Sequence, residues 1–184
     1  MAWLNTPRST WIALGVAVVM LSATWYPGLE DRFRQHKKTP IAEVGQAANL
    51  NFTLKNPAGE SVSFASFAGK TLILNFYATW CGPCRVETPD LVLLQAAHRD
   101  DLQVLGILIT DNPAKVPAFA VEFGITYPLL DGNERADLDD GFGPIDGLPR
   151  SVVIGPDGKI AAIHEGATLR PTFERDLAAI KSKR

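Results

Sequence analysis

The pattern of hydrophobic and polar positions along the chain switches between the period of a strand and that of a helix. Residues 71–80 (TLILNFYATW) and 102–110 (LQVLGILIT) are nearly continuous apolar runs rich in β-forming residues, which predicts two buried central strands. Strand–turn–strand patterns occupy residues 51–64, with NPAG at the turn, and residues 150–166, with PDG at the turn. The sequence therefore predicts a sheet that combines buried central strands with hairpins.

Helical spacing separates these strands. Apolar residues recur at helical spacing after the CGPC turn (residues 81–84), which predicts a helix that ends near His98. Residues 111–113 (DNP) supply a capping residue and a proline for the start of a second helix, and residues 127–131 (YPLLD) suit a short strand. A last helix is predicted over residues 171–181. This order, closed by a hairpin, predicts an α/β fold with a mixed central sheet flanked by helices.

The N-terminal part of the chain has a different character. Residues 10–26 carry no charge, and about 16 apolar or small residues extend roughly 24 Å as a helix, a little less than the ~30 Å hydrocarbon core of a bilayer. Aromatic residues lie near both ends, where interfacial rings are common. We expect an N-terminal transmembrane anchor within residues 1–26, a polar tether over 27–45 and one folded domain over 46–184. A cleaved signal peptide or a buried core helix are the alternatives for the first segment.

The charges around this segment give conflicting indications of topology. Arg8 precedes it, whereas Arg32, Arg34, Lys37 and Lys38 follow it, so the positive-inside rule alone would place the downstream domain in the cytoplasm. A single anchor before a domain that holds a Cys-x-x-Cys motif (residues 81–84) favours export instead. We therefore expect a single-pass protein of the inner (cytoplasmic) membrane whose folded domain, which carries this motif, faces the periplasm or the cell exterior.

Composition excludes several classes of protein. The net charge is −2, and the first 40 residues hold five basic and two acidic residues, so the remainder carries −5. This part of the chain lacks the basic excess of a nucleic-acid-binding protein, and we expect no nucleic-acid partner. Two cysteines are too few for a disulfide framework.

Cys81 and Cys84 are the two cysteines, and they lie three positions apart where a buried strand is predicted to run into a helix. Unpaired backbone N–H groups at a helix N-terminus favour a thiolate, so Cys81 is the predicted attacking thiol and Cys84 the resolving thiol of a redox pair. A structural disulfide is one alternative. Metal sites are the others: zinc lacks paired histidines here, while Cu(I) would take both thiols and His164.

The stretch FYATWCGPCRVETPDL (residues 76–91) resembles the active site of thioredoxin, and more closely that of the membrane-anchored TlpA/ResA/CcmG-like thiol-disulfide oxidoreductases. The likeness covers roughly residues 45–180. It implies a thioredoxin-like fold and an enzyme without a cofactor or a metal. The expected activity is reduction of protein disulfides in the exported compartment, as in cytochrome c maturation, with a membrane thiol reductase as electron donor. The alternatives are a disulfide oxidant or isomerase on the same fold, or a copper-binding assembly factor.

The resemblance assigns roles to single residues. Trp80 matches the tryptophan that flanks the nucleophile, and Pro89 matches the proline that kinks the active-site helix. Glu87 matches a glutamate near the thiols that is thought to help proton transfer; the alternative is an exposed first-turn acid stabilised by the helix dipole. Pro149 matches the cis-proline that faces the thiols, and the backbone of Leu148 would pair with the substrate strand.

Two positions depart from the family pattern. Asn75 stands where thioredoxin has a buried aspartate, so a proton-shuttling role would pass to Glu87, water or the partner. Arg150 follows the proline, where the family often has Thr or Glu. Its charge would favour the Cys81 thiolate or acidic partner surfaces, or else Arg150 is a solvated arginine at a strand edge.

Overall fold

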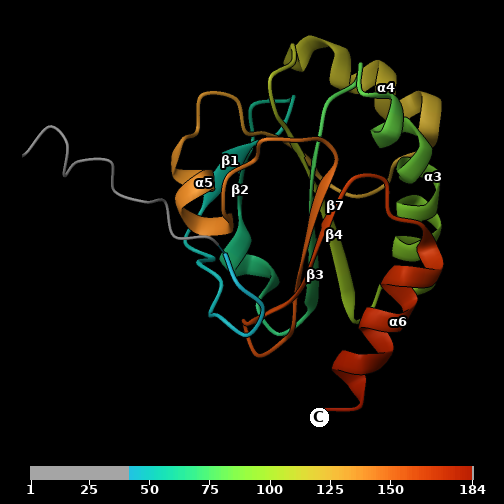
Figure 1. Ribbon diagram of the computed structural model, residues 1–184. Coiled ribbons are helices and arrows are strands. Elements are labelled where there is room, and N and C mark those ends of the chain that lie inside the picture. The colour runs from blue at the N-terminus through green and yellow to red at the C-terminus, as the bar shows by residue number, and fades with distance from the viewer. Residues whose placement is uncertain (1–41, 184) are drawn as a thin grey trace, which may run out of the picture. The chain divides into compact units, whose positions relative to one another are not determined.

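The computed structural model describes residues 42–183 as a seven-stranded sheet with helices on both faces (Figure 1). The strand order is β2-β1-β5-β4-β3-β6-β7. The strands are β1 (Thr53–Lys55), β2 (Ser61–Ser63), β3 (Thr71–Tyr77), β4 (Leu102–Leu108), β5 (Leu129–Asp131), β6 (Arg150–Ile154) and β7 (Ile160–Glu165). The expected anchor lies outside the described residues, as does most of the expected tether. Within residues 42–183, no helix has the length and apolar character needed to cross a membrane.

The sheet is mixed, as the sequence predicted. β3 pairs parallel with β4 and antiparallel with β6, so it is an internal strand, and all its residues are buried. β4 and β5 are parallel, whereas β1–β2, β1–β5 and β6–β7 are antiparallel. Both predicted hairpins and both predicted buried strands are confirmed.

Within residues 42–183, four α-helices cover the sheet: α3 (Gly82–Ala97), α4 (Val116–Phe123), α5 (Asp137–Phe142) and α6 (Arg170–Lys181). Two 3₁₀ turns, η1 (Phe64–Phe67) and η2 (Pro113–Lys115), complete the elements of the described chain. α3, α4 and α6 pack over one face of the sheet, and α5 packs over the other (Figure 1). Strand residues alternate between the two resulting cores: Ile73 and Tyr77 of β3 face the α3 side, and Leu72, Leu74 and Phe76 face the α5 side.

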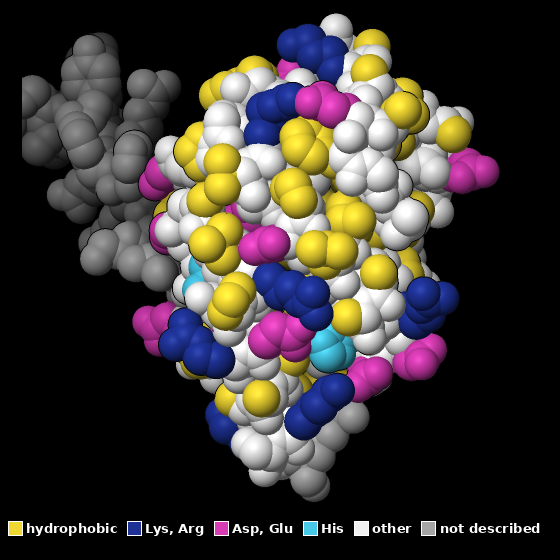
Figure 2. All heavy atoms as spheres, turned by 90° about the vertical axis from the view of Figure 1, so that its right-hand side faces the viewer, with side chains coloured by type: hydrophobic (Ala, Val, Ile, Leu, Met, Phe, Trp, Pro, Cys, Tyr) yellow, Lys and Arg dark blue, Asp and Glu magenta, His cyan; other side chains and the backbone are white. Residues whose placement is uncertain are grey.

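The outer surface formed by α3, α4 and α6 is mixed: hydrophobic side chains lie among charges of both signs (Figure 2). Ion pairs connect these helices: Arg85 of α3 pairs with Glu122 of α4, and His98 at the end of α3 contacts Glu174 of α6 at 2.9 Å. Exposed pairs of this kind contribute little to stability, typically about 0–1 kcal/mol. The helices are therefore held mainly by the apolar core beneath them.

One local feature differs from the sequence-based expectation. Helix α5 was not predicted from its own residues; it forms because Leu138 and Phe142 are fully buried. The predicted DNP cap is present before η2: Asn112 is the capping residue, and its side chain accepts the N–H of Ala114. The carboxylate of Asp111 turns toward a different part of the chain.

Candidate active site

Cys81 and Cys84 form a disulfide at the point where β3 leads into α3, with their Cα atoms 5.3 Å apart. Cys81 is the N-cap residue of α3, and its Sγ accepts the backbone N–H of Cys84 at 3.2 Å. This N–H is one of those that a helix leaves unpaired at its N-terminus. The predicted contact between the helix N-terminus and the Cys81 sulfur is therefore present.

A groove of about 400 Å³ runs beside the disulfide. One side is formed by residues 80–83, which include Trp80 and Cys81, together with Ile109 and Thr110. The other side is formed by residues 145–148, which end at Leu148. The groove thus brings Trp80, Cys81 and Leu148 of the predicted site together at one opening.

The Leu148–Pro149 peptide bond is cis, the isomer that the resemblance implied. Pro149 is buried, and its carbonyl accepts the N–H of Gly166 at 2.8 Å, which ties it to the end of β7. Trp80 is 61% exposed, and its indole Nε1 donates to the carbonyl of Thr110 at 3.3 Å. The tryptophan therefore presents most of its ring to solvent while its polar edge is fixed.

Glu87 lies one turn beyond Cys84 on α3 and is only 1% exposed. Its Oε1 accepts hydrogen bonds from Asn75 Nδ2 at 3.0 Å and from Ser151 Oγ at 2.9 Å. Its Oε2 accepts the backbone N–H of Thr168 at 2.9 Å. The exposed reading of Glu87 is wrong, because β3, β6 and the segment before α6 enclose its carboxylate.

Burial raises the pKa of Glu87 from 4.5 to about 7. The hydrogen bonds from Thr168 and Ser151 lower the pKa of Glu87 but do not outweigh desolvation, and the nearby charge of Asp90 raises it further. A carboxyl group with a pKa near 7 can take up and release a proton at neutral pH. Asn75 donates a hydrogen bond to this carboxyl group and does not itself titrate.

Arg150 is not a solvated arginine, because its residue is only 7% exposed. β6 alternates, so Ser151 faces Glu87 while Arg150 points toward the α5 side, where its Nη2 donates to the carbonyl of Phe142 at 2.9 Å. Nη1 pairs with Glu165 of β7. Arg150 therefore connects α5 to the sheet.

His164 does not approach the thiols in the way that the copper alternative requires. Its Nε2 contacts Asp176 of α6 at 2.7 Å, and its ring packs edge-on against Phe173. Among residues 42–183, no three Cys, His, Asp or Glu side chains are grouped closely enough to hold a metal ion.

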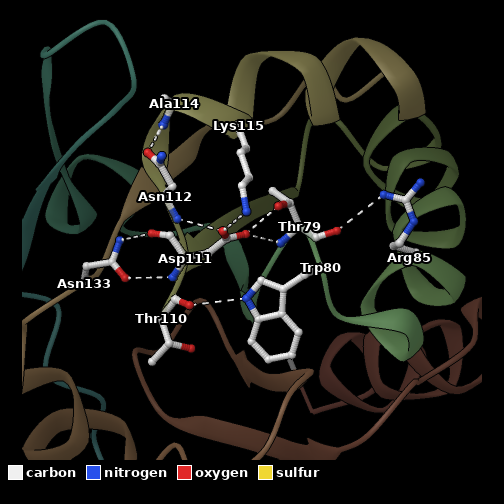
Figure 3. Close-up of polar contacts among 9 residues, drawn as sticks. All are labelled: Thr79, Trp80, Arg85, Thr110, Asp111, Asn112, Ala114, Lys115 and Asn133. Atoms are coloured by element: carbon white, nitrogen blue, oxygen red, sulfur yellow. Dashed lines mark hydrogen bonds and ion pairs between the residues drawn. The ribbon is translucent and has the colours of Figure 1, made fainter.

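Asp111 is a residue near the groove to which the sequence assigned no role beyond its place in the predicted DNP cap. Its Oδ2 accepts both the N–H and the hydroxyl of Thr79, and its Oδ1 accepts Lys115 Nζ at 3.1 Å (Figure 3). Burial alone would raise the pKa of Asp111, but these hydrogen bonds and that from the Asn112 N–H lower it to about 2. The carboxylate is thus ionised across the physiological pH range.

Comparison with known proteins places this geometry in context. Residues 43–179 match the Redoxin family. Thioredoxin-like protein YneN of Bacillus subtilis is 32% identical over 170 residues, covering 91% of this chain and 96% of that protein. Thiol-disulfide oxidoreductase ResA of Geobacillus kaustophilus is 29% identical over 168 residues, covering 90% and 92%. The crystal structure of a thiol:disulfide interchange protein of the thioredoxin family from Chlorobium tepidum is 30% identical, with a TM-score of 0.67 over 76% of this chain and 99% of that one. The predicted fold is confirmed by this structural match.

Proposed function

The chain belongs to the Redoxin family and is a thiol-disulfide oxidoreductase of the ResA-like type, and from this premise we propose that it reduces protein disulfides in the exported compartment. The observation that carries the proposal is the position of Cys81. Its sulfur accepts an N–H at the N-terminus of α3 and lies at the edge of an open groove. That environment stabilises a thiolate, which is the attacking species in disulfide exchange.

The proposed reaction has two exchange steps. The Cys81 thiolate attacks one sulfur of a substrate disulfide, which forms a mixed disulfide and releases the other substrate sulfur as a thiolate. The Cys84 thiolate then attacks Sγ of Cys81 and releases the second substrate thiol. The substrate gains two electrons and two protons, and the chain ends with the Cys81–Cys84 disulfide. A membrane thiol reductase would return the pair to the reduced state, since an oxidising compartment does not.

Glu87 is the proposed proton carrier for the resolving step. It follows Cys84 by three positions on the same helix, so both side chains project from one face of α3. Its pKa of about 7 allows it to accept a proton from the Cys84 thiol and later release it. Asn75 cannot exchange a proton in this way, which leaves Glu87 as the buried acid of the site.

The groove is the proposed substrate-binding surface. Trp80 offers an exposed ring on one wall, and Leu148 lies on the other with the cis bond to Pro149 behind it. In this proposal the backbone of Leu148 pairs with an extended substrate segment, and Trp80 packs against its side chains. Oxidised Cys-x-x-Cys pairs such as the haem-attachment site of an apocytochrome c are suitable substrates, because both sulfurs lie in one short segment.

The equilibrium reduction potential of Cys81–Cys84 tests the direction of the reaction. The full chain in detergent is titrated against a thiol buffer at pH 7. A potential near that of thioredoxin, about −270 mV, supports the reductase. A potential near that of DsbA, about −120 mV, would instead make the protein a disulfide donor.

The membrane-anchored, exported arrangement has a separate test. Alkaline phosphatase, which needs disulfides formed outside the cytoplasm, is fused after residue 40. We expect activity from this fusion, because the domain is proposed to face the periplasm or the cell exterior. An inactive fusion that is made at normal levels would contradict that orientation.

A further inference from the structure

Trp80 forms one wall of the groove, and its position depends on residues that are distant in sequence. Thr79 precedes it directly, and both the N–H and the hydroxyl of Thr79 are donated to Asp111 Oδ2, the N–H at 2.8 Å. The carbonyl of Thr79 lies 3.4 Å from Arg85 Nη1 of α3. The N–H, the hydroxyl and the carbonyl of Thr79 are therefore all hydrogen-bonded, and Asp111 accepts the first two of these bonds.

Thr110, which directly precedes Asp111, contacts the Trp80 indole itself. Its carbonyl accepts Trp80 Nε1, and its φ of +53° is one that β-branched residues rarely adopt. Such a conformation persists only where its surroundings hold it. Asn133, which follows β5, supplies that hold: its Oδ1 accepts the N–H of Asp111 at 3.2 Å and its Nδ2 donates to the Asp111 carbonyl at 2.8 Å.

These contacts form a continuous path from Asn133 through Asp111 to Trp80 (Figure 3). Asp111 is the point where the path divides, since its backbone fixes the adjacent Thr110 and its side chain fixes Thr79. The side chain of Asp111 is only 2% exposed, so its hydrogen bonds are shielded from water. Nothing in the exchange chemistry needs this carboxylate, which does not line the groove beside the thiols.

We propose that Asp111 is a positioning residue for substrate binding, which holds Thr79 and Thr110 so that the Trp80 ring forms a fixed wall of the groove. This inference rests on the proposed function of the groove as the site for protein disulfides. Because Asp111 acts on the wall and not on the sulfurs, its loss weakens binding of an extended substrate. The intrinsic reactivity of Cys81 toward a small disulfide is retained.

Asp111→Ala in the full chain tests the proposal, with Lys115→Gln as the matched control. Lys115 is 56% exposed and contacts only Oδ1, so its replacement leaves both bonds from Thr79 in place. The reduced protein is mixed with an oxidised Cys-x-x-Cys-His peptide over a range of concentrations and, separately, with the small disulfide dithiobis(nitrobenzoic acid). Single-turnover oxidation gives a half-saturating peptide concentration and a limiting rate.

For Asp111→Ala we expect the half-saturating peptide concentration to rise at least about fivefold, the size of effect seen when a contributing interface residue is truncated. The limiting rate and the rate with the small disulfide should stay within about twofold, and Lys115→Gln should match the wild type. In a Trp80→Ala background, Asp111→Ala should add little, because the wall it positions is already gone.

The remaining outcomes contradict the proposal in distinguishable ways. An unchanged half-saturating concentration, or an equal loss on both disulfides, would overturn the role of Asp111 while leaving the reductase intact. A wild-type chain that reduces neither disulfide would overturn the proposed function and this inference with it. Should Asp111→Ala not fold, Thr79→Val decides in the same assay, since it removes one of the two donors to Oδ2 and keeps the side-chain volume.

Discussion

Replacing Glu87 with glutamine tests the buried acid, through the pH dependence of stability. In the folded chain the pKa of Glu87 is raised from 4.5 to about 7, chiefly by burial. Between these pH values the unfolded chain has released its proton and the folded chain has not. Raising the pH therefore favours unfolding, and the stability contributed by the protonated carboxyl is complete below about pH 4.5 and lost as the pH passes 7.

The magnitude follows from the same two values. A rise from 4.5 to about 7, at 1.36 kcal/mol per pKa unit, corresponds to roughly 3 kcal/mol of unfolding free energy. Glu87 is 1% exposed, so no discount for solvent screening applies. Glutamine does not titrate, so any loss of hydrogen bonding to Thr168 in Glu87→Gln shifts its stability by a constant amount and leaves the pH dependence unaffected.

The assay is denaturant unfolding of the oxidised full chain, in which the cysteines do not titrate, at intervals from pH 4 to pH 8. We expect the stability of the wild type relative to Glu87→Gln to fall by roughly 3 kcal/mol across this range, mostly between pH 4.5 and 7. Glu43→Gln, which removes an exposed carboxylate, should show a much smaller pH-dependent difference. A difference between wild type and Glu87→Gln that stays flat across the range would refute the argument that burial controls this carboxyl.

Three further predictions concern the framework around the site. Phe142→Ala should lower the free energy of unfolding by about 3–5 kcal/mol, because the ring is fully buried. Urea titration measures this loss, and a cost below about 1 kcal/mol would contradict the view that the Phe142 ring holds α5 against the sheet. Gly106→Ala should cost about 1–3 kcal/mol in the same titration, since the new Cβ would lie 2.5 Å from Leu129 Cδ2, and an unaffected variant would mean that this side chain moves freely. Glu165→Gln should cost about 1 kcal/mol because it removes the carboxylate that pairs with Nη1 of the buried Arg150; a stability equal to that of the wild type would show that the pair contributes nothing.

The parts of the fold that sequence reasoning predicted well are those with dense local signals. The continuous apolar run of β3 and the CGPC start of α3 each specify their structure within a few residues. Helix α5 has no such signal. Its sequence, DLDDGF, contains three aspartates and a glycine, all poor helix formers, and only the burial of Leu138 and Phe142 in the core makes it helical.

The candidate site shows the same division. Its thiols are three residues apart and were identified directly, whereas the surroundings of other groups depend on distant partners. A solvated position stayed open as an alternative for Arg150 because α5, which supplies its acceptor at Phe142, was itself not predicted. Asp111 was given no role beyond its place in the DNP cap, because its partner, Thr79, lies 32 residues earlier on another segment. No local pattern encodes such a contact.

The carboxylate pocket around Glu87 is completed late along the chain. Asn75 and Glu87 are 12 residues apart, but Ser151 and Thr168 lie 64 and 81 residues beyond Glu87. Bringing such distant segments together is the slow part of folding, because the entropy of closing a long loop is lost before the contacts form. The two cysteines lie within a single helical turn, whereas the Glu87 carboxylate gains two of its three partner residues only when β6 and the segment before α6 have docked. In the proposed mechanism, in which Glu87 carries the proton, full exchange activity therefore requires these distant contacts as well as the thiols.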